Sequence, residues 1–239
     1  MDVSEIVQPG IRIFGVLMME PVTVITDLLI TAVCFYAFWR VHKEAPKNAI
    51  TLFMKGFFIT MGIATVCGAF IGHGFLYYLG EKWKLIGWYT SMISVALIER
   101  AAISHARKLI SPKLGKFFLV LNVIELITLM VLTTVTLHFK FVEYHSAYGF
   151  LVVVLSFHLY TYLKTKDEGS KYMLYNTVVL LIAVFIFNKP VILDVFFNHR
   201  DLAHLFMALA VYLIMLGTLK LNTYPDTASK EKAEAILNP

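Results

Sequence analysis

Charged residues are scarce in this chain of 239 amino acids. Only 15% are Asp, Glu, Lys or Arg, 59% are hydrophobic, and the mean hydropathy is +0.73. A soluble domain carries about 25% charged residues. So little polar surface cannot cover a water-facing globule, and the apolar residues stand in long runs. The composition therefore argues against a soluble globular protein and predicts an integral membrane protein.

Other features that the sequence lacks narrow its organisation further. The two cysteines, Cys34 and Cys67, both lie in apolar runs, so neither a disulfide framework nor a zinc finger is indicated. The first residues have neither the basic region nor the cleavage site of a signal peptide. Without an internal repeat or a low-complexity tract, the sequence predicts three parts: an outer segment 1–21, a membrane domain 22–219 and a cytoplasmic tail 220–239.

Seven apolar segments account for most of the membrane domain. A helix needs about 20 residues to cross roughly 30 Å of hydrocarbon, and these segments reach or approach that length without the alternating polarity of a barrel strand. The sequence thus predicts an all-α bundle of seven transmembrane helices. The segments are Val22–Trp39, Phe57–Leu79, Leu85–Ser104, Phe117–Leu137, Ser146–Leu163, Tyr172–Phe187 and Leu202–Leu219.

The basic residues between these segments predict the orientation of the bundle. Cytoplasmic loops carry an excess of Lys and Arg. The loops after the first, third and fifth segments and the C-terminal tail hold fourteen such residues, against six on the opposite side. The N-terminus is therefore expected outside and the C-terminus in the cytoplasm, which requires an odd number of crossings. A bacterial cytoplasmic membrane or its equivalent is the expected location.

Polar residues near the outer ends of three segments form the first candidate site. Histidines and carboxylates at one depth are the chemistry of a divalent metal site, and an open coordination position would let zinc activate water. We expect His73, His199 and His204 as metal ligands and Asp27 and Asp201 as catalytic carboxylates. For His199 the alternative is a hydrogen-bonded group in the headgroup region.

A second polar group is predicted deeper in the bundle, toward the cytoplasmic side. Two roles are possible for this group: a structural network in which Arg100 neutralises a glutamate, or a path for protons or a ligand. Asn122 and Glu125 are three residues apart and therefore face the same way. The group comprises Glu99, Arg100, Asn122, Glu125 and His158.

A histidine near the end of the second segment and a His/Asp group at the start of the seventh resemble the CREST superfamily. That superfamily holds alkaline ceramidases and the progestin and adiponectin receptors. The resemblance implies a zinc ion held by histidines of the second and seventh helices, here His73 and His204. It also implies hydrolysis of an amide or similar bond in a lipid by zinc-activated water.

Three positions depart from the pattern of that superfamily. Arg200 stands four residues before His204, where a second histidine is expected, and Ala69 stands where a serine is expected. The stretch Leu85–Trp88 lacks the expected Asp. The segments 20–27 and 198–204 also look like signatures of uncharacterised bacterial seven-helix proteins.

Three functions follow from these patterns. The first is a membrane-embedded, metal-dependent hydrolase acting on a lipid-like amide or ester, with membrane lipids as its surroundings and no nucleic-acid partner. The second is a b-type haem protein, in which two of the histidines would be axial ligands. The third is a transporter or sensor with a polar pathway through the bundle. Protein partners are left open.

Overall fold

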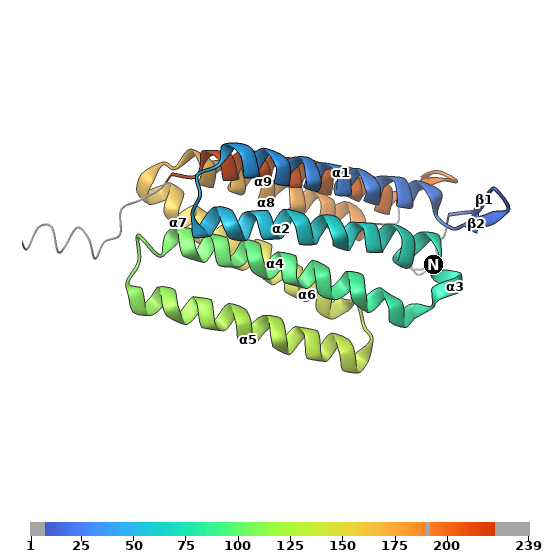
Figure 1. Cartoon of the computed structure of the whole chain (residues 1–239), viewed down its shortest axis with the longest axis horizontal. Coiled ribbons are helices and arrows are strands. Elements are labelled where there is room, and N and C mark those ends of the chain that lie inside the picture. The colour runs from blue at the N-terminus through green and yellow to red at the C-terminus, as the bar shows by residue number, and fades with distance from the viewer. Residues whose placement is uncertain (1–7, 190–191, 223–239) are drawn as a thin grey trace, which may run out of the picture.

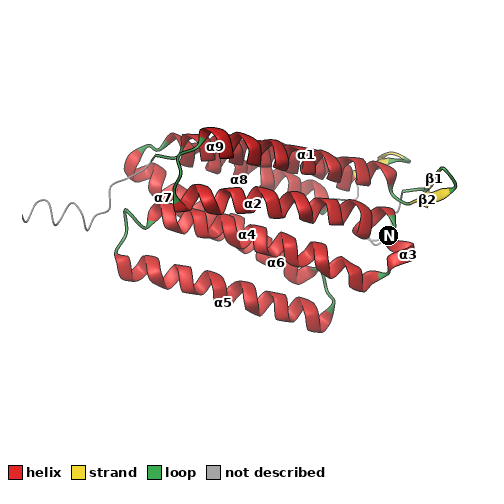
Figure 2. Ribbon diagram, viewed as in Figure 1, coloured by secondary structure: helices red, strands yellow, loops and turns green. Residues whose placement is uncertain are grey.

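The computed structural model describes residues 8–189 and 192–222, and these residues are almost entirely helical (Figure 2). The strands are β1 (Ile11–Ile13), β2 (Val16–Met18), β3 (Ile192–Asp194) and β4 (Phe197–Asn198). The helical elements are α1 (Pro21–Glu44), α2 (Ala49–Cys67), η2 (Gly68–Gly74), α3 (Leu76–Leu79), η3 (Glu81–Trp83), α4 (Lys84–Ala106), α5 (Pro112–Thr136), α6 (Lys140–Ala147), η4 (Tyr148–Val154), α7 (Leu155–Thr165), α8 (Glu168–Phe187) and α9 (His199–Lys220).

Local sequence signals fix where several helices begin. Pro21 and Pro112 stand in the first turns of α1 and α5, where a missing N–H costs nothing. Asn48 caps α2 by accepting a hydrogen bond from the Thr51 backbone N–H at 2.8 Å. Asp167 caps α8 in the same way. The Asn48 cap starts α2 several residues before Phe57, where the apolar run that predicted this helix begins.

The long helices lie side by side along one axis (Figure 1). α4 packs against α2, α5 and η4, α1 packs against α2 and α9, and α8 packs against α9. Both short antiparallel hairpins, β1–β2 and β3–β4, lie at one end of the bundle, which we call the hairpin end. The connections after α1, α4 and α7 lie at the opposite end.

Two long helices contain a π-helical segment. In the first, α2 continues into η2, where the N–H of Phe75 donates to the carbonyl of Phe70, five residues back, at 2.8 Å. In the second, η4 joins α6 to α7. π-helical turns occur often at functional sites because they displace the residues that follow from the regular helical face.

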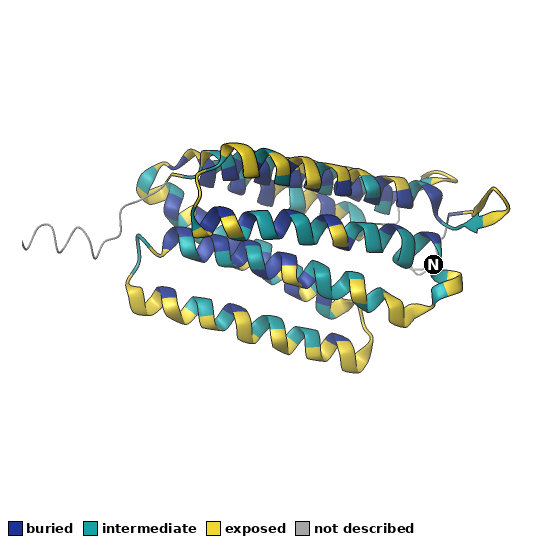
Figure 3. Cartoon of the chain, in the orientation of Figure 1, coloured by how far each residue is buried: buried dark blue, intermediate teal, exposed yellow. Residues whose placement is uncertain are grey.

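The core contrasts with the outer surface of the bundle. Apolar residues of α1, α2, α4, α8 and α9 fill the interior, among them Cys34, Phe57 and Met215. The outer face of α5 is exposed (Figure 3), and large apolar side chains line it at helical spacing. Such a continuous apolar stripe suits contact with lipid. Its residues are Phe117, Val120, Ile124, Ile127 and Val131.

Six helices are long and apolar enough to cross a membrane, which indicates a membrane protein. They are Pro21–Glu44, Ala49–Gly74, Pro112–Thr136, Lys140–Thr165, Glu168–Phe187 and His199–Lys220. The third predicted segment, Leu85–Ser104, corresponds to α4, which is equally long but carries Lys84, Glu99 and Arg100. Of the predicted outer segment and cytoplasmic tail, residues 1–7 and 223–239 lie outside the described part of the chain.

Candidate functional site

Side chains of α1, η2 and α9 meet at the hairpin end of the bundle. We call this group the hairpin-end cluster. η2 and α9 both pack against α1, so residues far apart in sequence come together there. The cluster consists of Glu20, Asp27, His73, Arg200, Asp201 and His204.

His73 lies between the carboxylate of Glu20, the residue that precedes α1, and that of Asp27 in α1. Its Nδ1 is hydrogen-bonded to the carboxylate of Glu20, and its Nε2 lies 3.9 Å from Oδ2 of Asp27. A carboxylate accepts, so Nδ1 carries the proton of the neutral imidazole and Nε2 presents its lone pair. This arrangement, with one ring nitrogen held by a carboxylate and the other free, is typical of metal-ligating histidines.

Asp27 also approaches the second imidazole of the cluster. Its Oδ1 lies 3.7 Å from Nδ1 of His204, and the two imidazole rings have their centroids 6.5 Å apart. Oδ2 of Asp27 is buried and has no hydrogen-bond partner. A buried carboxylate oxygen of this kind is stabilised by a cation, because burial in a low-dielectric interior disfavours an unpaired charge.

The tautomer of His204 follows from its neighbour Thr26. The Thr26 hydroxyl donates to the carbonyl of Thr23 at 3.1 Å and lies 3.0 Å from Nδ1 of His204. The single hydroxyl hydrogen is thus committed, and the hydroxyl oxygen accepts from Nδ1–H. In both His73 and His204 the lone pair therefore belongs to Nε2.

Glu20 stands in an unusual backbone conformation at the start of α1. Its φ of 44° and ψ of 55° are left-handed, which costs a non-glycine residue about 1–2 kcal/mol. Burial raises the pKa of its carboxyl, but the hydrogen bond and charge of His73 and the charge of Arg200 outweigh burial and hold the pKa below its usual value. Arg200 donates to Glu20 at 3.2 Å. Glu20 is thus an ionised carboxylate that orients His73.

Asp201 is occupied by structural hydrogen bonds. Its carboxylate accepts from the backbone N–H of Asn198 at 2.8 Å, from the Thr23 hydroxyl at 2.8 Å and from Gln8 Nε2 at 2.5 Å. Together with Asn198 it forms the capping box of α9. Asp201 thus anchors α9 to α1 and to the segment before β1, and it contacts neither imidazole.

His199 lies apart from the other two histidines. It is the first residue of α9, so it already has helical geometry, and five residues on a helix turn its direction away from His204. Its ring packs against Phe187 with centroids 6.3 Å apart. Among the described contacts, none joins His199 to His73, Asp27 or His204. The structure therefore gives the predicted ligand His199 a packing position.

Small residues let α1 approach η2 closely. A Cβ at Gly68 would lie 3.1 Å from Oδ2 of Asp27, and one at Gly74 would lie 3.3 Å from Val24. The carbonyl of Gly74 also accepts a hydrogen bond from the N–H of Met19, the residue before Glu20, at 3.0 Å. The glycines of η2 thus position the carboxylates of α1 rather than the imidazole of His73.

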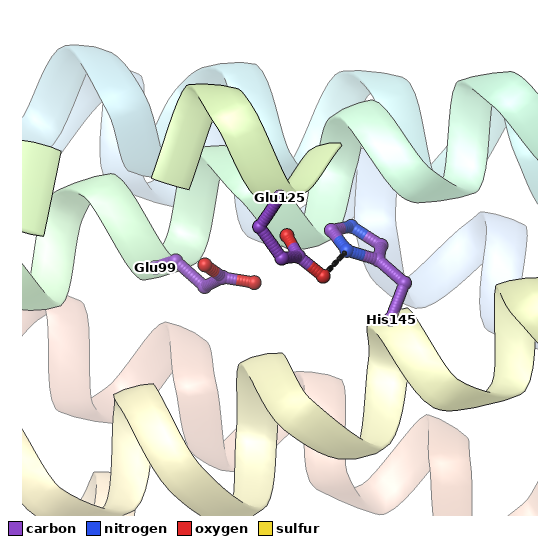
Figure 4. Close-up of side chains that lie close together, drawn as sticks. All are labelled: Glu99, Glu125 and His145. Carbon is purple, nitrogen blue, oxygen red and sulfur yellow. Dashed lines mark hydrogen bonds and ion pairs between the residues drawn. The ribbon is translucent and has the colours of Figure 1, made fainter. Parts of the chain in front are cut away.

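A second cluster, which we call the Glu99–Glu125–His145 cluster, joins α4, α5 and α6 (Figure 4). Nδ1 of His145 lies 2.7 Å from Oε1 of Glu125, and Asn122 donates to Oε2 of Glu99 at 2.9 Å. Among the described residues, this is the group of three metal-ligand side chains whose ligand atoms all lie within 4.8 Å of one another. The hairpin-end cluster is more open.

The expected role of Arg100 differs in the structure. Arg100 donates to Oδ1 of Asn122 at 3.3 Å and to the carbonyl of Leu119 at 3.4 Å. Within the described part of the chain, no ion pair joins Arg100 to Glu99 or Glu125. The guanidinium therefore binds the amide that holds Glu99, and it does not neutralise either glutamate directly.

His158, also expected in the deeper group, belongs to a third set of contacts at the opposite end of the bundle. Its Nδ1 lies 3.0 Å from the hydroxyl of Ser170, and its ring centroid lies 5.8 Å from that of His105. Asp167 accepts from the Ser170 N–H at 2.6 Å and the Asn222 N–H at 2.9 Å. Burial raises the pKa of Asp167, but these hydrogen bonds and that of His105 lower it well below its usual value.

Comparison with protein families gives one match, to a model described as a family of unknown function (DUF6962), over residues 22–223. The chain belongs to this family. No curated protein and no solved structure matches the chain. The match to DUF6962 covers the long helices from residue 22 onward and both clusters except Glu20, so nearly all of the polar residues described above lie within the matched region.

The sequence predictions gave no role to three residues of these polar sites. Arg200 lies four residues before His204, a spacing that places both on one helix face, and this was the signal for its place beside Glu20. His145 lies one residue before the predicted segment Ser146–Leu163, although the helix extends back beyond it to Lys140. Asp167 is followed three residues later by Ser170, which is the spacing of a helix cap.

Proposed function

We propose that seven helices cross the membrane, with the hairpin end outside and the C-terminal end in the cytoplasm. α2 ends at the hairpin end and α5 begins at the opposite end, so the helix between them, α4, runs the full length of the bundle (Figure 1). α4 packs against α2, α5 and η4, which shield Glu99 from lipid. The excess of Lys and Arg at the opposite end supports the orientation.

We further propose that the hairpin-end cluster binds zinc through Asp27, His73 and His204, and that the protein is a metal-dependent hydrolase of a lipid-like amide or ester. The observation that carries this proposal is the buried Oδ2 of Asp27, which has no hydrogen-bond partner and lies 3.9 Å from Nε2 of His73. The ring of His204 lies beside the other oxygen of the same carboxylate, with its Nδ1 3.7 Å from Oδ1.

The spacing of these atoms is compatible with a common ion. Zinc binds nitrogen and oxygen ligands at about 2.0–2.2 Å, so two ligands of one tetrahedral zinc lie roughly 3.3 Å apart. The distance of 3.9 Å between Oδ2 of Asp27 and Nε2 of His73 exceeds this value by about 0.6 Å. Zinc binding therefore requires the Asp27 and His73 side chains to move closer by this amount.

Each neighbour of the three ligands has a distinct role in the proposed reaction. Glu20 holds His73 in the tautomer that presents Nε2, and Thr26 does the same for His204. Bound zinc would supply a water of lowered pKa that attacks a carbonyl carbon. Arg200, held by Glu20, is a cationic group of the same cluster and suits stabilisation of the negative charge that develops on the carbonyl oxygen.

The resemblance to the CREST superfamily agrees with this assignment in part. The second and seventh long helices supply the histidines, as in that superfamily. The acidic ligand comes instead from Asp27 on the first helix, whose carboxylate reaches η2 because Gly68 leaves room for it. A lipid-like substrate suits this site because its acyl chains can lie along the apolar outer surface of the bundle.

The test is a metal analysis of the purified full-length protein and of single alanine variants. His73→Ala and His204→Ala should each lose one equivalent of zinc relative to the unmodified protein. His199→Ala is the matched control, since it removes an imidazole from the same end of α9 and should leave the zinc content unchanged. Retention of the full zinc content by a folded His73→Ala variant would refute the proposal.

The haem alternative is less compatible with this geometry. A haem bound through two histidines must fit its flat macrocycle between the imidazoles. Asp27 lies within 4 Å of both His73 and His204 and fills part of that space. An absorption spectrum of the purified protein, which would show an intense Soret band if haem were bound, distinguishes the two.

Transport is the second candidate function, and one observation favours it. Glu99 and Glu125 place two carboxylates inside the bundle, where ionisable groups commonly mark ion or proton pathways. If His73→Ala keeps full activity and Glu125→Gln abolishes it, transport replaces hydrolysis as the preferred function.

A further inference from the structure

The Glu99–Glu125–His145 cluster has two carboxylates that face each other without a neighbouring cation. Glu99 is fully buried, and the Glu125 side chain is 14% exposed. Within the described residues, no lysine or arginine forms an ion pair with either carboxylate. Oε1 of Glu99 and Oε2 of Glu125 are both buried without a hydrogen-bond partner. One oxygen of each carboxylate lies within 4.8 Å of the other, and two ionised carboxylates this close repel each other unless a positive charge lies between them.

The tautomer of His145 adds a third ligand atom. Nε2 lies 2.8 Å from the backbone carbonyl of Met92, and a carbonyl only accepts, so Nε2 carries a hydrogen. In the neutral imidazole the lone pair then belongs to Nδ1, which faces Oε1 of Glu125 at 2.7 Å. A lone pair directed at a carboxylate is unfavourable unless a cation binds both.

The surrounding residues hold this arrangement as the neighbours of a metal site do. Asn122 donates to Oε2 of Glu99 and is itself held by Arg100. A Cβ at Gly149, in η4, would lie 2.6 Å from Oε1 of Glu99, so only glycine lets η4 pack against this oxygen. Hydrogen bonds that orient the ligands are a regular feature of metal sites.

We propose that Glu99, Glu125 and His145 form a second site, which binds a divalent first-row transition-metal ion. Two carboxylates and one neutral imidazole carry a total charge of −2, so a divalent ion makes the buried site neutral. An imidazole ligand favours Zn²⁺, Mn²⁺ or Fe²⁺ over Mg²⁺ and Ca²⁺, which prefer oxygen alone. The partly exposed side chain of Glu125 gives the ion an entry path.

This site shares no ligand with the hairpin-end cluster, so each of the two proposals can be tested and refuted independently of the other. The experiment starts from a full-length His73→Ala/His204→Ala variant, in which the first site is removed. After purification in the presence of Zn²⁺ and removal of excess metal, this variant should retain one equivalent of Zn²⁺. Addition of Zn²⁺ to the metal-free form should raise its unfolding temperature, because a ligand that binds the folded state stabilises it.

Ligand substitutions in that background test the assignment. Glu99→Gln and Glu125→Gln keep the shape of the side chain, and each should weaken Zn²⁺ binding more than about 10-fold, as should His145→Gln. His158→Gln is the control, because it replaces a buried histidine in the third set of contacts and should leave Zn²⁺ binding unchanged. Mn²⁺, followed by its paramagnetic resonance, serves as a second probe.

The alternative is that His145 is protonated and forms an ion pair with Glu125, with no metal. In that case the folded double variant retains neither Zn²⁺ nor Mn²⁺, and neither ion changes its unfolding temperature. That result overturns this proposal and leaves the first site untouched. If instead the double variant holds as much metal as the unmodified protein, the first proposal fails and this one stands, provided that the ligand substitutions remove the metal.

Discussion

Glu20 allows the proposed metal site to be tested through a residue that is not itself a ligand. Its carboxylate holds Nδ1 of His73 and also accepts from Arg200. Removing a carboxylate that orients a metal-bound histidine lowers metal affinity roughly 10–100-fold, or about 1.4–2.7 kcal/mol. Glu20→Ala should therefore weaken zinc binding by this factor without removing a ligand.

The left-handed backbone of Glu20 supplies a matched variant. Glu20→Gly also removes the carboxylate, so its zinc affinity should fall as much as that of Glu20→Ala. Glycine adopts a φ of 44° without strain, so Glu20→Gly should be about 1 kcal/mol more stable than Glu20→Ala. The difference in stability separates the conformational effect of the substitution from the loss of the carboxylate.

Zinc affinity is measured by competition with a coloured chelator, and stability by thermal unfolding followed through tryptophan fluorescence. If Glu20→Ala binds zinc as tightly as the unmodified protein, Glu20 does not orient a ligand. If Glu20→Gly and Glu20→Ala have equal stability, the strain assigned to this residue is absent.

Three further predictions concern topology, stability and pH. A cysteine in place of Lys113 should react with an impermeant reagent only from the cytoplasmic side, and one in place of Lys82 only from outside; labelling of both from one side would end the seven-crossing proposal. Asp167→Asn should lower stability at pH 7 by about 1–2 kcal/mol, because it weakens the interaction with His105. Folding lowers the pKa of Asp167, so its stabilising effect is complete above the unfolded pKa of about 3.8 and is lost as the pH falls toward the folded value. The unfolding temperatures of Asp167→Asn and of the unmodified protein should therefore converge between about pH 4 and pH 2. A difference that stays constant over this range would contradict the prediction. Zinc affinity at the hairpin-end cluster should fall as the pH is lowered, since neutral imidazole is the ligand; an affinity that stays constant between about pH 8 and pH 5 would contradict imidazole ligation.

The helix plan could be predicted well from the sequence, because long apolar runs report directly on membrane-spanning helices. The positions at which the helices begin and end were harder to predict from the sequence. The second predicted segment began at Phe57, but Asn48 starts the helix at Ala49 and carries it through the polar Lys55. Similarly, α6 begins at Lys140, six residues before the apolar run. Caps and amphipathic ends extend a helix beyond its hydrophobic stretch, and a hydropathy pattern does not record them.

The approach of His73, Asp27 and His204 could be anticipated because depth in the membrane sorts residues by position along each helix. The rotation of each helix about its own axis, which decides where a side chain points, could not be anticipated. Asp201 and His204 are three residues apart and were expected to act together, yet Asp201 is used by the capping box and by Thr23. A carboxylate in the first turn of a helix accepts hydrogen bonds from the free backbone N–H groups there, and these bonds fix the direction of the side chain.

Each polar cluster also has a π-helical segment beside it, which a 3.6-residue period does not predict. A π-helical turn contains an extra residue, so every side chain beyond it is rotated by about 100° from the position that a 3.6-residue period predicts. η2 contains His73 at the hairpin-end cluster, and η4 places Gly149 against Glu99 at the second cluster. Departures from local regularity in natural proteins concentrate at functional sites, because the strain persists only where the displaced side chains have a use. The coincidence of both π-helical segments with the two metal-type clusters thus supports a functional origin for both.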